Sequence, residues 1–183
     1  MPAALLALVL LAADAPVQSP AEVRAEVRAL LGVIDRPISA ESFRRFGPAG
    51  EAALADIALS RDFAPRRARA LEVLAELRSP RAEEVHQAIA RAAEAPRTVR
   101  RTAVLGLGRL LAADRAPGVL RPYLERDPDA GVRAAAADAL AGAAPGSACR
   151  EIRLQARREH GAAGAARFRR ALATCDRASG ATR

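Results

Sequence analysis

The chain contains no lysine and no tryptophan, and it has a single tyrosine. Aromatic residues make up only 3% of its 183 residues, which disfavours a nucleic-acid site, because such sites stack bases on aromatic side chains. The whole formal charge of +8 is carried by arginine, a bias that we attribute to a GC-rich coding sequence rather than to a binding surface. With 51% hydrophobic and 27% charged residues, the chain is nonetheless predicted to fold as one domain.

Metal-binding and catalytic residues are equally scarce. Two cysteines and two histidines, with no close cysteine partners, cannot supply a four-ligand metal site. We expect His86 and His160 to be structural, with His160 at a helix end, where an imidazolium is favoured by the dipole. No strand and no phosphate-binding glycine loop is evident. The sequence therefore predicts no enzyme activity, no catalytic residue, no cofactor and no metal.

No apolar run is long enough to span a bilayer, which takes about 20 residues. The longest covers residues 3–13 and is followed by a polar stretch rich in proline, a pattern typical of secretory signals. No basic residue precedes the run, and Pro16 follows the small-x-small site at 13–15, so cleavage after Ala13 is an alternative. A buried first helix is the competing interpretation. We predict a signal peptide over 1–15 and a periplasmic or secreted protein, with a cytoplasmic location as the alternative.

Cys149 and Cys175 support the same compartment. Each lies on the apolar stripe of a predicted helix, over 147–160 and 162–175, and the two are nearly equidistant from a turn at Gly161. An antiparallel pair would place them side by side, so we predict a disulfide that stabilises the hairpin by roughly 3–4 kcal/mol. Stable disulfides belong to exported proteins. The alternative is a buried pair of reduced cysteines.

The centre of the chain repeats itself with a period of 33 residues. Each copy is an amphipathic helix that follows a proline and an acidic residue, and another helix precedes it, over 50–60, 81–93 and 117–126. One such pair cannot bury its apolar face alone, so the pairs must stack. The matched positions are an arginine (Arg67, Arg100, Arg133), an alanine (Ala70, Ala103, Ala136), a leucine (Leu74, Leu107, Leu140) and a small residue (Ala75, Gly108, Ala141).

The stretch from Asp127 to Leu140 resembles the second-helix signature of HEAT repeats in their short bacterial form, and 94–107 is similar. The first copy departs from the family, with Arg66 where valine is preferred, and a fourth copy at 162–175 lacks the arginine. The resemblance implies an all-α fold, a right-handed α-α superhelix (solenoid) of about three helix pairs with helical caps. It also implies that the repeat arginines pair with acids in adjacent turns, as a structural ladder of Arg67, Arg100 and Arg133 with Asp62, Glu94 and Asp127. Tetratricopeptide and ankyrin signatures are missing.

The predicted organisation has five parts. After the signal segment, 16–45 holds a linker and an N-terminal cap with helices at 20–34 and 39–46, the second one capped by Ser39. Residues 46–146 hold the repeats, 147–175 the hairpin with the disulfide, and 176–183 a disordered tail.

The charge is uneven: 9 of the 29 arginines fall in the last 37 residues. We predict a non-catalytic, monomeric scaffold or adaptor in the cell envelope that binds a protein partner through an exposed stripe of Arg101, Leu105 and Arg109. One alternative is a binder of an anionic polymer, whether nucleic acid, acidic lipid or polysaccharide, and nucleic acid is the least favoured of these. Another is a lyase-like HEAT relative acting on a bound chromophore. The predicted anion-binding residues are Arg150, Arg153, Arg157, Arg167 and Arg170.

Overall fold

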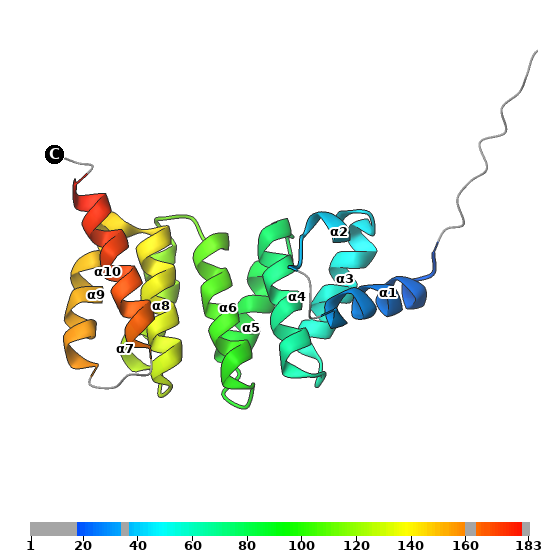
Figure 1. Ribbon diagram of the computed structural model, residues 1–183, viewed down its shortest axis with the longest axis horizontal. Helices are drawn as coiled ribbons and strands as arrows, with labels where there is room; N and C mark the ends of the chain where they lie inside the picture. The colour runs from blue at the N-terminus through cyan, green and yellow to red at the C-terminus, as the bar shows by residue number, and fades with distance from the viewer. Residues whose placement is uncertain (1–17, 34–36, 160–163, 181–183) are drawn as a thin grey trace, which may run out of the picture.

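The computed structural model describes residues 18–33, 37–159 and 164–180, and it folds them into ten helices without a strand. Most of the helices stand side by side along an elongated molecule (Figure 1). Within these residues, no helix has the length and apolar character needed to cross a membrane. The predicted signal peptide at 1–15, His160 and the turn at Gly161 lie outside the described residues.

Eight of the described helices form consecutive pairs. The second helices of the pairs pack against one another in sequence order, α4 on α6, α6 on α8 and α8 on α10, and we call them the second-helix layer (Figure 1). The C-terminal hairpin thus extends the stack as a fourth pair, where the sequence predicted about three pairs and a cap. The pairs are α3 (Gly47–Leu59) with α4 (Ala64–Leu77), α5 (Ala82–Arg91) with α6 (Arg97–Leu110), α7 (Ala116–Arg126) with α8 (Ala130–Ala143), and α9 (Pro145–Arg158) with α10 (Ala165–Gly180).

The N-terminal cap consists of α1 (Pro20–Gly32), which packs on α3, and the short α2 (Glu41–Arg44). Ser19 and Glu22 start α1 with a reciprocal capping box, in which each side chain accepts the other residue's backbone N–H. The prediction that Ser39 caps α2 was wrong. The helix begins at Glu41, so its N-cap is Ala40, and the Ser39 hydroxyl accepts the N–H of Glu41.

The repeated leucines and alanines form the centre of the core. Leu74, Leu107 and Leu140 are completely buried, and burying a leucine side chain contributes roughly 1.5–3 kcal/mol. Gly108 sets the spacing of α6 and α8, because a Cβ there would lie 2.7 Å from the Cβ of Ala139. At this position of the second repeat, close packing of α6 on α8 therefore requires glycine.

His86 has the structural place that its sequence context indicated. Its side chain is fully buried in α5, and Nδ1 lies 2.6 Å from the carbonyl oxygen of Ala82. Burial lowers the pKa of His86, which favours the neutral ring. Gly106 of α6 makes room for this ring, because a Cβ at that position would lie 2.2 Å from Nε2.

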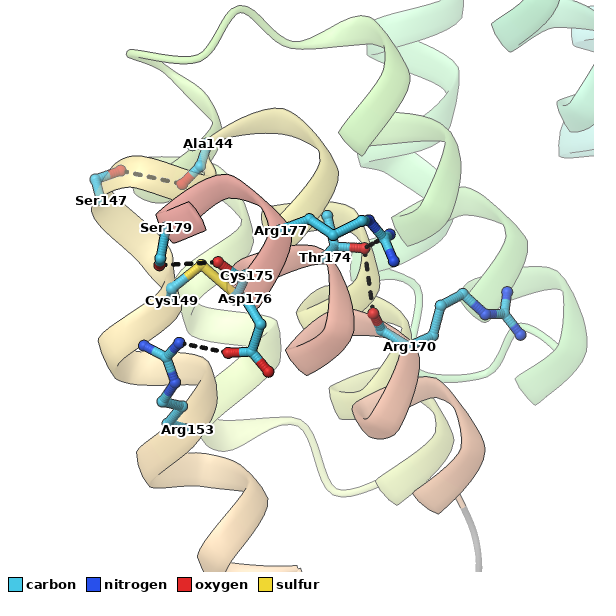
Figure 2. The surroundings of a disulfide bond; sticks show 10 residues. All are labelled: Ala144, Ser147, Cys149, Arg153, Arg170, Thr174, Cys175, Asp176, Arg177 and Ser179. Atoms are coloured by element: carbon cyan, nitrogen blue, oxygen red, sulfur yellow. Dashed lines mark hydrogen bonds and ion pairs between the residues drawn. A yellow bond between two sulfur atoms is a disulfide. The ribbon is translucent and has the colours of Figure 1, made fainter. Parts of the chain in front are cut away.

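The two cysteines are joined by a disulfide that ties α9 to α10 (Figure 2), with 5.5 Å between their Cα atoms. Both are buried. The predicted tail was wrong as far as Gly180, because α10 continues past Cys175 to that residue. This last stretch is held by a 2.8 Å ion pair between Arg153 of α9 and Asp176.

Candidate partner-binding surface

The three repeat arginines cap the first helices of their own pairs. Arg67 Nε donates to the carbonyl of Ala58 at 2.9 Å, and Arg100 Nε donates to that of Ala90 at 3.3 Å. Arg133 donates from Nη1 to the carbonyl of Asp127 at 2.7 Å, just after α7. The last carbonyls of a helix have no hydrogen-bond partner within it and lie at the negative end of its dipole. A guanidinium supplies both the missing hydrogen-bond donor and a compensating positive charge.

The carboxylate partners of these arginines differ from the predicted ones. Arg100 pairs with Asp127 at 2.5 Å, and Arg133 pairs with Glu159 at 2.5 Å, each acid coming from the next pair along the stack. One nitrogen of each of these two arginines binds a backbone carbonyl in its own helix pair. The remaining guanidinium nitrogens therefore point toward the next helix pair along the stack. Arg67 has no carboxylate partner among the described residues. Asp62, its predicted partner, binds Arg66 at 2.6 Å and Arg28 at 3.0 Å.

The joints between the pairs are therefore unequal. Several ion pairs cross from the second pair to the third and from the third to the fourth. Between the first and second pairs the described residues form no ion pair. That joint is formed by apolar packing and two hydrogen bonds. Arg78 donates to the backbone carbonyl of Arg109 at 2.9 Å, and the Ser79 hydroxyl donates to the Glu51 carboxylate at 2.8 Å.

Arg101, predicted to face a partner, is engaged within the fold. Its Nη2 lies 2.9 Å from Oδ1 of Asp129, and its guanidinium occupies the space where a Cβ of Gly131 would lie. Asp129 also caps α8 by accepting the N–H of Val132 at 2.9 Å. Burial alone would raise the pKa of Asp129, but the hydrogen bonds from Arg101 and Val132, together with the positive charges of Arg101 and Arg97, outweigh it and lower that pKa. Arg101 thus fixes the joint between two pairs.

The other two residues of the stripe line a groove across the second-helix layer. Leu105 is half-buried, Arg109 is exposed, and the groove has a volume of about 290 Å³. Arg167 and Arg170 of α10 border it, each with Nη1 3.5 Å from the same oxygen, Oδ2 of Asp138. We call this the arginine groove, and it is lined by Leu105, Gly108, Arg109, Asp138, Ala139, Gly142, Arg167 and Arg170.

The predicted anion-binding set is divided between two places. Arg150, Arg153 and Arg157 lie on α9, where Arg153 is paired with Asp176. Figure 2 shows Arg153 beside the disulfide, whereas the side chain of Arg170 extends away from it. Arg167 and Arg170 belong to the arginine groove. The five residues therefore do not form one patch.

Sequence reasoning missed that Arg109 and the α10 arginines share one groove. The 33-residue register contained part of the signal, since Asp138 and Gly142 are the counterparts of Leu105 and Arg109. The α10 arginines have no counterparts in this register, because the sequence of the fourth helix pair no longer follows the repeat pattern. Within the described residues there is no cluster of side chains suited to a metal ion.

Comparison with known proteins identifies the repeated region. The family model for HEAT repeats matches residues 51–141, from within α3 to within α8. No curated protein and no solved structure matches the chain.

Proposed function

Because the chain belongs to a HEAT-like repeat family, we propose that it is a non-catalytic scaffold whose second-helix layer binds a specific protein partner. HEAT repeats form scaffolds for protein interaction, but a fold does not by itself fix a function. The observation that carries the proposal is the arginine groove. There Leu105 offers an apolar contact beside Arg109, an exposed arginine with no ion-pair partner among the described residues.

Photo-crosslinking in the native host tests the proposal. A photoreactive amino acid at Leu105 is expected to give discrete protein adducts. The matched control is Ala88, an exposed residue of the first helix α5, where these adducts are expected to be absent. Equal adducts at both positions, or no protein adduct at Leu105, would contradict the proposal.

We place this scaffold in the cell envelope. The support is the buried disulfide between Cys149 and Cys175, because stable disulfides belong to exported proteins. The test is the intact mass of protein purified from its host, with thiols alkylated before and after unfolding. A shortened chain that resists alkylation supports export, and a full-length chain with two reactive thiols contradicts it.

A second candidate function is binding of an anionic lipid surface by α9. Arg150 and Arg157 are exposed there, and neither has an ion-pair partner among the described residues. Electrostatic binding of this kind weakens with salt. Co-sedimentation with phosphatidylglycerol vesicles is expected to fall at high salt and with Arg150→Ala/Arg157→Ala. Binding that is unchanged by salt or by the variant would exclude this candidate.

A further inference from the structure

We propose that the arginine groove binds the carboxylates of an acidic, leucine-containing segment of the partner protein, held between Arg109 of α6 and the α10 arginines. This inference rests on the proposed scaffold function and specifies the chemistry of its partner. The groove contains Leu105 and Arg109 of the predicted protein-binding stripe together with Arg167 and Arg170 of the predicted anion-binding set.

The ion pairs in the groove leave cationic groups available. Arg167 and Arg170 share one oxygen of Asp138 at 3.5 Å, whereas well-formed pairs of this type have distances of about 2.7–2.9 Å. Arg109 has no ion-pair partner among the described residues. Three guanidinium groups thus face a single carboxylate, so the groove has an excess of positive charge that an acidic segment would complement.

The engaged arginines of the same layer provide an internal comparison. Arg133 binds both oxygens of Glu159, at 2.5 and 2.8 Å, and Arg101 makes three hydrogen bonds to Asp129 at 2.9–3.2 Å. These arginines already have the paired geometry that a guanidinium prefers with a carboxylate. The groove arginines lack it, because Arg167 and Arg170 contact Asp138 only through Nη1 at 3.5 Å, which leaves their other donors available to an incoming carboxylate.

The shape of the groove has room for a peptide side chain. Small residues line it between α6 and α8, and a Cβ added at Gly142 would meet no atom within 4 Å. Gly108 and Ala139 pack closely beneath this space. Half-buried Leu105 supplies the apolar contact, so the lining suits a segment that alternates acidic and aliphatic side chains.

The same lining argues against a phosphate polymer. None of the lining residues is aromatic, so bases would have no stacking surface. We therefore assign the groove to an acidic protein segment, and a nucleic acid becomes an outcome of the test.

Fluorescence anisotropy tests the assignment on the full chain with its disulfide intact. The probe is a fluorescein-labelled peptide of alternating glutamate and leucine, and the reference peptide has glutamine in place of glutamate. Arg109→Glu and Arg170→Glu are each expected to weaken binding of the glutamate peptide at least tenfold. Arg150→Glu makes the same charge change on α9 and is expected to alter binding less than twofold. Asp138→Asn is expected to tighten binding, because it releases both α10 arginines.

Three results would overturn the assignment. The first is equal affinity for the glutamate and glutamine peptides. The second is equal weakening by Arg109→Glu and Arg150→Glu, which would indicate only a general charge effect. The third is tighter binding of an oligothymidylate of matched charge, lost in Arg109→Glu, which would assign the groove to nucleic acid. If the peptide result fails while crosslinks at Leu105 still capture a protein, the carboxylate assignment falls and the proposed scaffold function stands.

Discussion

Arg100 of the second helix pair donates hydrogen bonds from both of its terminal nitrogens to the carboxylate of Asp127 in the third pair. Both side chains are almost completely buried, with exposed fractions of 9% and 4%. Arg100 also caps α5 through Nε. One side chain thus joins the end of its own first helix to the loop that starts α8.

Removing one partner of this pair should destabilise the fold strongly. Arg100→Met leaves the Asp127 carboxylate buried without its cation, which typically costs about 3–5 kcal/mol. The measurement is the free energy of unfolding in urea, followed by circular dichroism. The double variant Arg100→Met/Asp127→Leu should cost less than Arg100→Met alone, because no buried charge is left.

An exposed ion pair serves as the control. Arg24 and Asp56 are 50% and 57% exposed, and such pairs contribute about 1 kcal/mol or less. Arg24→Met should therefore change the free energy of unfolding little. A comparable loss in Arg24→Met and Arg100→Met would contradict the importance given to the buried pair.

Asp129 should make the free energy of unfolding depend on pH in the acid range. Its pKa in the folded state is below the ordinary value of about 3.9. Its carboxylate therefore contributes stability above that value, and the contribution is lost as the pH falls from about 4 through the lower folded pKa. Asp129→Asn keeps a cap at the start of α8 but has no charge to titrate. Urea unfolding at pH 5 and at pH 3 should show a smaller loss of stability in this variant than in the wild type, and an identical loss would contradict the assignment.

Gly106 should not tolerate a side chain. A Cβ there would overlap the ring of buried His86, and overpacking of this kind costs about 1–3 kcal/mol. The thermal midpoint should fall in Gly106→Ala. In a His86→Ala background the ring is absent, so Gly106→Ala should cause no further fall. Gly118→Ala in α7 is the control, because its Cβ would meet open space, and its midpoint should stay the same or rise.

Loss of the disulfide should loosen one end of the stack. Cys149→Ala/Cys175→Ala removes a cross-link worth roughly 3–4 kcal/mol in the chain-entropy model. Repeat stacks respond through nearest neighbours, so hydrogen exchange should speed up in α9 and α10 and stay unchanged in α4. Uniform acceleration along the chain would show that the stack unfolds as one unit instead.

The fold was predictable because its signals are local or periodic. Leu74, Leu107 and Leu140 mark the buried stripe of each second helix at a fixed spacing, and the structure buries all three. The partners of the arginines were not predictable in the same way. Arg100 reaches Asp127 in the following pair, and which acid it reaches depends on how two pairs stack.

The candidate site was predictable only in part, for the same reason. Helical spacing placed Leu105 and Arg109 on one exposed stripe, but it also included Arg101, whose engagement by Asp129 is a contact between pairs. Arg170 reaches the groove because α10 packs on α8. A helical wheel contains no information about that packing.

The uneven joints give the molecule a mechanical polarity. Ion pairs connect the second helix pair to the third and the third to the fourth. The first and second helix pairs have no ion pair between them among the described residues. Concentrated salt screens the more exposed ion pairs of these joints, such as Arg115–Glu83, and affects the buried Arg100–Asp127 pair much less. High salt should therefore weaken the two C-terminal joints only in part. In dilute buffer, a molecule stretched between its ends should part first between α4 and α6, and the arginine groove, which lies wholly beyond that point, would survive the break.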